Sequence, residues 1–120
     1  MAGPPRRVDR LADQIRAEIA TLIAEELRDP RIGFSTVTRV ELAADLSHAR
    51  VMVSVLGSPE AQQATLDGLS SAAGFIRHEI SHRLRLRRSP ELVFVLDRGP
   101  EAGLKVETVL NELQKPPEES

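Results

Sequence analysis

Two stretches of β-branched residues, separated by only five residues, constrain the possible folds of this chain more than any other feature. The first is FSTVTRVEL at residues 34–42, with Phe34, Thr36, Thr38, Val40 and Leu42 on one parity. The second is HARVMVSVL at residues 48–56, with Ala49, Val51, Val53 and Val55 on one parity. Alternation with a period of two is typical of strands, and a link as short as AADLS is typical of a hairpin. We therefore expect two adjacent antiparallel strands.

The residues around this hairpin predict helices and one more strand. Apolar residues at helical spacing run from Val8 to Leu27, so we expect a helix over residues 8–28, ended by DPRIG. Ser58 and Pro59 are typical of a helix start, which predicts a helix over residues 59–71. A second helix should follow from about residue 75, with ELVFVL (91–96) as a buried strand and a last helix at 104–113.

The predicted order is therefore α-β-β-α-α-β, an α+β class with a three-stranded mixed sheet, because two helices between strands leave room for a parallel crossover. The length of 120 residues suits one domain. We expect a flexible N-terminal tail at residues 1–7, the folded domain at 8–113 and a flexible C-terminal tail at 114–120. The chain has no cysteine, secretory signal or long apolar run, so we expect a cytoplasmic monomer without membrane contact.

The second half of the chain contains a strongly basic segment. Residues 77–88 carry five arginines against one acid, Glu79, although the formal net charge of the whole chain is −2. On a helix, one face would hold Arg77, His78, Ser81, His82 and Arg85, with Arg87 and Arg88 beyond its end. Arg83 falls near the apolar stripe of Ile76, Ile80 and Leu84. A solvated helix face usually mixes charge signs, and this face does not, so we predict contact with phosphates.

The aromatic content suggests which parts of a nucleic acid would be contacted. The chain has no Trp or Tyr, and we expect its three phenylalanines, Phe34, Phe75 and Phe94, to lie in the core. Unpaired bases are usually bound by stacking on aromatic side chains. We therefore expect contacts with phosphates and sugars, with an affinity that falls steeply as salt is added.

The same segment contains HEISH at residues 78–82, which matches the H-E-x-x-H pattern of zinc proteases. In that pattern His78 and His82 would bind zinc and Glu79 would act as a general base. A catalytic zinc needs a third protein ligand, and the remaining histidine, His48, begins a distant predicted strand. Flanking arginines would also repel a dication. We keep a zinc-dependent hydrolase as the alternative, and predict neither a metal nor another cofactor.

Two long segments resemble the bacterial ribosome-binding factor A family. They are DPRIGFSTVTRVELAADLSHARVMVSVLG and AAGFIRHEISHRLRLRRSPELVFVLD, and the resemblance covers about residues 6–113. It implies a type II KH-like fold, no enzymatic activity and a cytoplasmic location. It also implies binding to the free small (30S) ribosomal subunit and to the 16S rRNA precursor, in a factor that assists late assembly and 5′-end maturation and matters most in the cold.

The resemblance also bears on particular residues. Ala72, Ala73 and Gly74 form the Ala-x-Gly interruption that this family has in place of the G-x-x-G loop of other KH domains. Small residues there should let two helices meet at a kink. Arg6, Arg7 and Arg10 are candidates for a second RNA contact, whereas Arg31 is expected to be a turn residue. A further alternative is a protein-interaction module that uses the long first helix.

Overall fold

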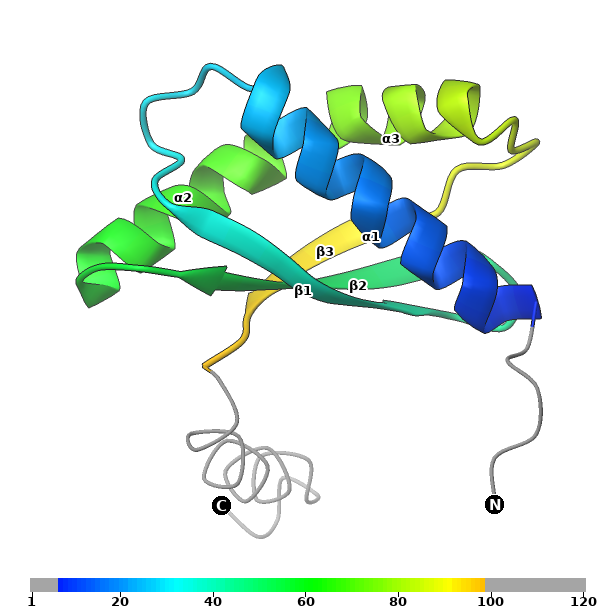
Figure 1. The fold of residues 1–120 in the computed structure, drawn as a ribbon, viewed down its shortest axis with the longest axis horizontal. Helices are drawn as coiled ribbons and strands as arrows, with labels where there is room; N and C mark the ends of the chain where they lie inside the picture. Colours follow the sequence, from blue (N-terminus) through cyan, green and yellow to red (C-terminus); the bar gives the residue numbers. More distant parts are fainter. Residues whose placement is uncertain (1–6, 99–120) are drawn as a thin grey trace, which may run out of the picture.

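The computed structural model describes residues 7–98, and their elements follow the predicted order (Figure 1). The helices and strands are α1 (Arg7–Glu25), β1 (Ser35–Leu42), β2 (His48–Val55), α2 (Pro59–Ser71), α3 (Ala73–Arg83) and β3 (Glu91–Leu96). The helix predicted at 104–113 and the tail predicted at 114–120 lie outside the described residues. The predicted domain boundaries therefore stay a prediction.

The first helix ends three residues earlier than the sequence predicts, at Glu25 instead of residue 28. The backbone N–H groups of Glu26 and Leu27 both donate to the carbonyl of Leu22, at 2.9 and 3.0 Å, so the regular ladder closes there. Ser58 is the N-cap of α2, as predicted. Its hydroxyl accepts a hydrogen bond from the N–H of Ala61 at 3.1 Å.

The three strands form one mixed sheet in the order β1-β2-β3. Strands β1 and β2 pair antiparallel, from Ser35 opposite Val55 to Leu42 opposite Ala49. Strands β2 and β3 pair parallel, from His48 opposite Glu91 to Val53 opposite Leu96. The hairpin and the parallel pair predicted from the sequence are thus both confirmed.

The parity predicted for the first strand holds only in part. The register of β1 shifts between Val37 and Arg39, and the buried residues are Val37 and Val40, three positions apart. A β-bulge inserts one extra residue and so moves the following side chains to the other face. The hydroxyl of the bulge residue Thr38 donates to Asp97 Oδ2 at 2.6 Å and to the carbonyl of Met52 at 3.2 Å. The bulge thereby connects β1 to the chain that follows β3.

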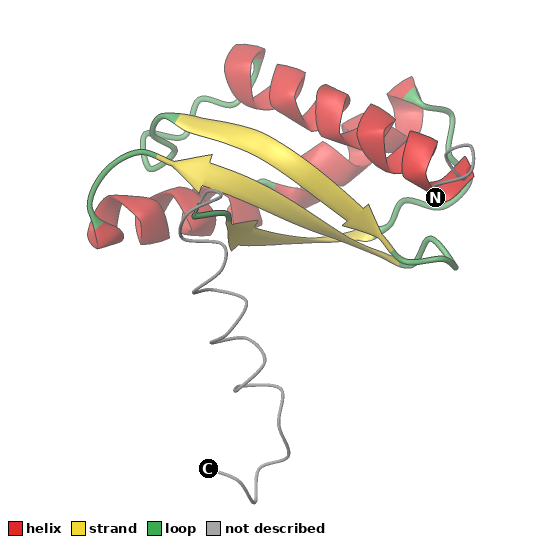
Figure 2. Ribbon diagram, turned by 60° about the horizontal axis from the view of Figure 1, so that its bottom comes forward, coloured by secondary structure: helices red, strands yellow, loops and turns green. Residues whose placement is uncertain are grey.

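The helices lie along one side of the sheet, and in Figure 2 most of the strand surface faces the viewer in front of them. The core between the layers consists of aliphatic side chains and Phe94. Helix α1 contributes Ala12, Ile15, Ile19 and Leu22 to it, and α3 contributes Ile76 and Ile80. The core fixes which face of α3 points outward.

Within residues 7–98, we find no helix with the length and apolar character that crossing a bilayer requires.

Candidate nucleic-acid interface

The two helices of the second half meet at a single residue. Ala72 ends α2 and begins α3, with φ −88° and ψ 0°, and its N–H donates to the carbonyls of Gly68 and Leu69 at 3.1 Å. Ala72 and Ala73 are half-buried against the core. Gly74 differs, because an added Cβ there would meet no atom within 4 Å among the described residues. The two helices thus meet at the predicted interruption, and steric crowding by other parts of the described chain is not what requires glycine at position 74.

The residues predicted to form the basic face of α3 differ in their exposure to solvent. Ile76 and Ile80 are buried, as the apolar stripe predicts, and His78 and His82 are exposed on the outer side. Arg77 and Ser81 are half-buried instead. Of the residues predicted to share this face, His78, His82 and Arg85 are therefore exposed, whereas Arg77 and Ser81 are only partly exposed.

Arg77 and Ser81 both bond to the segment between α3 and β3, residues 84–90, which we call the arginine loop. Arg77 Nε donates to the carbonyl of Pro90 at 3.1 Å, and Arg77 Nη2 donates to the carbonyl of Ser89 at 3.2 Å. The hydroxyl of Ser89 donates back to the carbonyl of Arg77 at 3.0 Å, and that of Ser81 donates to the carbonyl of Leu86 at 3.1 Å. These two site candidates thus face the protein.

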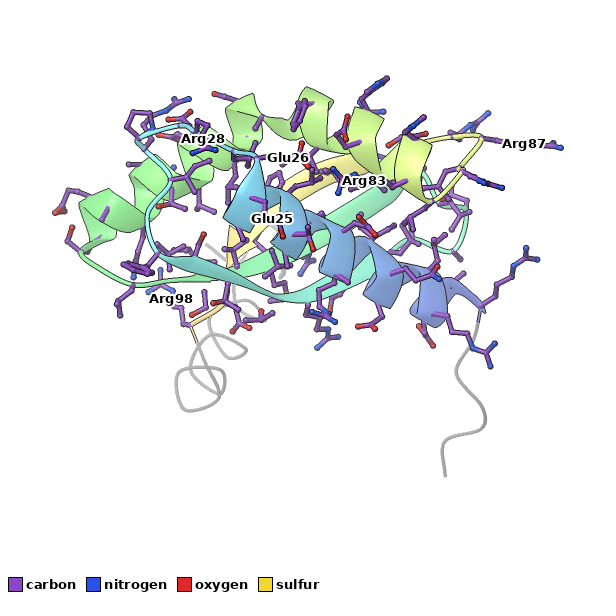
Figure 3. The ribbon with its side chains drawn as sticks, turned by 45° about the horizontal axis from the view of Figure 1, so that its top comes forward. Glu25, Glu26, Arg28, Arg83, Arg87 and Arg98 are labelled. Atoms are coloured by element: carbon purple, nitrogen blue, oxygen red, sulfur yellow. The ribbon has the colours of Figure 1, made fainter. Side chains whose placement is uncertain are left out.

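The arginine loop presents the exposed cations. Within residues 7–98, the side chains of Arg85, Arg87 and Arg88 are exposed and make no hydrogen bond or ion pair. Figure 3 labels Arg87, whose side chain extends away from the ribbon. Leu84 and Leu86 alternate with these arginines and pack against the core. Within residues 84–87, the L-R-L-R pattern thus anchors the loop through its leucines and exposes its arginines to solvent.

Arg85 has an unusual backbone conformation. Its φ is 55°, in the left-handed region that favours glycine. The helix ends just before it, and the N–H of Leu86 donates to the carbonyl of Ser81 at 2.9 Å, as in helix ends that place a left-handed residue after the cap. An arginine at this position carries a backbone cost that glycine would avoid.

Arg83, unlike the exposed arginines of the arginine loop, is surrounded by carboxylates. It forms ion pairs with Glu18 and Glu79, at 3.4 and 3.3 Å, and with Glu26. Figure 3 shows it between α3 and α1. Hydrogen bonding to Glu26 raises the pKa of Arg83 above its usual value. Placing Arg83 outside the basic face is consistent with this geometry, because its charge is compensated by carboxylates near the end of α1.

Arg31 is a turn residue, as predicted. Its guanidinium pairs with Asp29, with Nη2 2.6 Å from Oδ2, and its backbone N–H donates to Asp29 Oδ1 at 2.9 Å. These bonds, the side-chain bond first, lower the pKa of Asp29 to about 2. The carboxylate of Asp29 therefore compensates the charge of Arg31 and holds the turn after α1.

The first turn of α1 lies at the same end of the molecule as the arginine loop, as Figures 1 and 2 both show. Arg7 and Arg10 belong to this turn and are exposed. Arg6 lies outside the described residues. The two described arginines could thus extend a cationic surface that begins on the arginine loop.

The zinc alternative gains no support from the geometry. Within the described part of the chain, no group of three or more histidine, aspartate or glutamate side chains could hold a metal ion. Glu79, the would-be general base, pairs with Arg83. The other alternative, a partner helix on α1, is likewise weakened, because the apolar face of α1 is buried in the core.

The three phenylalanines do not share one environment. Phe94 is 7% exposed and belongs to the core as predicted, but Phe34 is 84% exposed and Phe75 is 44% exposed. The prediction that all three lie in the core is therefore wrong. Phe34 begins the hairpin, where its carbonyl accepts from the N–H of Leu56 at 3.1 Å. Phe34 directly precedes β1, and an alternating pattern does not show whether such a residue is covered by the rest of the fold.

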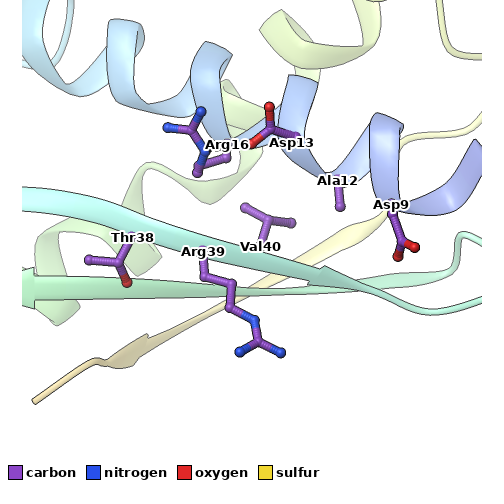
Figure 4. Close-up of a pocket in the computed structure, with 7 residues that line it drawn as sticks. All are labelled: Asp9, Ala12, Asp13, Arg16, Thr38, Arg39 and Val40. Carbon is purple, nitrogen blue, oxygen red and sulfur yellow. Dashed lines mark hydrogen bonds and ion pairs between the residues drawn. The ribbon is translucent and has the colours of Figure 1, made fainter. Parts of the chain in front are cut away.

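A hollow of about 230 Å³ lies between α1 and β1 (Figure 4). Its lining consists of Asp9, Ala12, Asp13, Arg16, Thr38, Arg39 and Val40. The two arginines in it are compensated, because Arg16 pairs with Asp13 at 2.9 Å and Arg39 pairs with Glu41 at 2.6 Å. None of the site residues predicted from the sequence lines this hollow, and both of its arginines are paired with carboxylates, so it does not favour phosphate binding.

Comparison with known proteins agrees with the fold and with the resemblance. The family model described as ribosome-binding factor A matches residues 7–110. A ribosome-binding factor A from Thermomicrobium roseum is 51% identical over 112 residues, covering 93% of this chain and 87% of the relative. The crystal structure of ribosome-binding factor A from Thermus thermophilus matches with a TM-score of 0.67 at 30% identity, over 76% of this chain and 97% of that one.

One further solved structure is informative about context. It is a Thermus thermophilus ribosome-binding factor A homology model fitted into the cryo-EM map of a 30S complex. It matches with a TM-score of 0.61 at 32% identity, over 73% of this chain and 92% of that one. The family model covers most of the chain, and the curated relative is matched over nearly its full length. The chain therefore belongs to the ribosome-binding factor A family.

Proposed function

We propose that this protein binds the free small (30S) ribosomal subunit and holds its rRNA through the arginine loop and the outer side of α3. The observation that carries the proposal is the contrast within one short segment. Arg85, Arg87 and Arg88 are exposed and uncompensated within residues 7–98, although the chain as a whole is weakly acidic. Arginine presents a planar fork of donors that fits phosphate oxygens.

The context of the family supports this partner. A related protein from Thermus thermophilus has been fitted into the map of a 30S complex. We propose, accordingly, that this chain acts in the cytoplasm as a non-enzymatic monomer. There it assists late assembly of the subunit and maturation of the 5′ end of the 16S rRNA precursor, with the greatest need in the cold.

The proposed interface has a centre and an edge. Arg85, Arg87 and Arg88 would bind phosphates, and His78 and His82 would contact the RNA beside them. Arg7 and Arg10, with Arg6 before them, would form the edge at the same end of the molecule. Because Phe75 is exposed in the first turn of α3, stacking on a base would add to the phosphate and sugar contacts that the sequence suggests.

Cosedimentation with purified ribosomal subunits tests the proposal. Wild-type protein should move with small subunits and not with large ones. A triple variant, R85Q/R87Q/R88Q, should lose the small subunit at physiological salt. A matched triple variant, R16Q/R39Q/R50Q, removes the same charge from arginines that pair with Asp13 or Glu41. It should bind like wild type, and equal loss in both triples would contradict a localised interface.

A further inference from the structure

We infer that Arg77 is a positioning residue of the proposed rRNA interface: it fixes the arginine loop from inside instead of touching RNA. This inference rests on the proposed function. The sequence places Arg77 among the phosphate-contacting cations, but its guanidinium is half-buried and donates to the carbonyls of Pro90 and Ser89 at 3.1 and 3.2 Å. A guanidinium can bind two carbonyls at once because its donors form a rigid fork.

The arginine loop is held at Leu86, Ser89 and Pro90. Both backbone groups of Leu86 bond to Ser81: the N–H donates to the carbonyl at 2.9 Å, and the carbonyl accepts from the hydroxyl at 3.1 Å. Ser89 is bonded to Arg77 through its carbonyl and through its hydroxyl. Pro90 is buried behind them.

The arginines proposed to bind phosphate lie next to these fixed points or between them. Arg85 precedes Leu86, and Arg87 and Arg88 lie between Leu86 and Ser89. A loop fixed in this way loses little conformational freedom on binding, and its cations already have a defined spacing. Such spacing suits recognition of RNA by the positions of its phosphates, because the geometry of the cations is set before the complex forms.

Two roles for Arg77 make different predictions for binding to purified small ribosomal subunits. A phosphate-contacting arginine releases counterions, so its removal should lower the salt dependence, the slope of log K against log salt, by about one. A positioning residue should lower the affinity and leave that slope unchanged. We expect R77M and R77K each to weaken binding by about tenfold at constant slope, because lysine keeps the charge but loses the planar fork.

Amide hydrogen exchange supplies the structural readout. In both variants, the N–H of Leu86 should exchange faster than in wild type, whereas the amides of Val51 and Val53 in the buried strand β2 should keep their protection. If R77M does not fold, R77K and S89A carry the test. S89A removes only the hydroxyl that donates to the carbonyl of Arg77, and we expect it to weaken binding about twofold to threefold at constant slope.

The outcomes separate this inference from the proposed function. If R85Q/R87Q/R88Q binds like wild type, the proposed function fails and the inference fails with it. If the triple variant loses binding but R77K binds like wild type, Arg77 is no positioning residue and the proposed function stands. A slope lowered by about one in R77M would likewise assign Arg77 to direct contact. Weaker binding of R77K and R77M at unchanged slope, with faster loop exchange, establishes positioning.

Discussion

Arg83 and Arg87 lie four residues apart in the sequence, yet only the charge of Arg83 is compensated by carboxylates within residues 7–98. Arg83 is surrounded by Glu18, Glu26 and Glu79, so three carboxylates face one guanidinium. Arg87 and its neighbours Arg85 and Arg88 have no such partner within residues 7–98. A basic run in a sequence is therefore a mixture of cations used inside the protein and cations available to a ligand. Only the folded arrangement separates the two kinds.

The end of α1 explains the difference. Helix α1 finishes with Glu25 and no basic residue in its last turn, although the C-terminal end of a helix favours cations. Arg83 supplies the missing positive charge from α3. The arginine loop begins just after it and has no acid among residues 84–90. The same segment thus stabilises the packing of two helices and then presents charge to solvent.

Charge reversal in the loop should have the largest effect. We expect R87E/R88E to lower the affinity for small ribosomal subunits by at least about a hundredfold, because two attractive contacts with phosphates become repulsive. The measurement is equilibrium binding at physiological salt, with circular dichroism to verify folding. Wild-type affinity in a folded R87E/R88E protein would contradict the distinction between loop arginines that bind a ligand and arginines that hold the fold.

Loss of Arg83 should act on stability instead of binding. We expect R83M to lower the melting temperature, because Glu18, Glu26 and Glu79 would be left close together without a cation. Conversely, the affinity of the folded protein for small subunits should stay within about twofold of wild type, because the guanidinium of Arg83 pairs with carboxylates of the protein and is not one of the cations proposed to bind phosphate. R83K, which keeps the charge, should recover part of the stability. A large loss of affinity in a well-folded R83M protein would place Arg83 in the interface.

Arg85 should show opposite effects on the two properties. R85G relieves the left-handed backbone at φ 55°, so we expect the free energy of unfolding to rise by about 0.5–1 kcal/mol. Its affinity for small subunits should fall severalfold, with loss of about one unit of salt dependence.

R87G is the matched control for R85G. Arg87 is absent from the described residues with positive φ, so glycine at this position should weaken binding without raising stability. Urea denaturation and binding titrations measure both properties. If R85G is less stable than wild type, the left-handed backbone is not costly.

The smallest effect concerns another compensated arginine, Arg31. The pKa of Asp29 is lowered from 3.8 to about 2 by its bonds with Arg31. A lowered pKa means that this group stabilises the folded state above pH 3.8, and that the contribution is lost as the pH falls from 3.8 towards 2. We therefore expect D29N to be less stable than wild type at pH 7. The gap should close below about pH 2, and thermal unfolding across this range measures it.

A gap between D29N and wild type that persists at low pH would assign the effect to packing instead of charge. Binding to small subunits should be unaffected in D29N, because Arg31 is a turn residue and not part of the proposed interface. This variant thus sharpens the difference between arginines that hold the fold and arginines that face a ligand.

Much of the fold could be predicted because local signals agreed with it. Ser58 and Pro59 start a helix at the predicted residue, and ELVFVL forms a strand with the predicted bounds. The strand is not buried as predicted, because Phe94 is its only buried residue and Val93 is 52% exposed. The bulge at Thr38 could not be predicted, because an extra residue leaves no mark in an alternating sequence. The exposure of Phe34 could not be predicted either, because an alternating pattern does not show which residues the rest of the fold covers.

The candidate site shows the same limit. A helical projection places Arg77, Ser81 and Arg85 on one face, and it identified the exposed His78 and His82 correctly. It cannot show that the segment after α3 runs back along that face. There, backbone carbonyls of this segment accept hydrogen bonds from the side chains of Arg77 and Ser81. The acids around Arg83 come from residues far away in the sequence, apart from Glu79. Long-range contacts therefore decided which arginines remain exposed.

The most direct test of the central claim is the salt dependence of binding to purified small ribosomal subunits, compared between wild type and R85Q/R87Q/R88Q. If the three loop arginines each contact a phosphate, the slope of log K against log salt should be smaller in the triple variant by about two to three units. Equal slopes for the two proteins would contradict the claim, because the loop arginines would then displace no counterions.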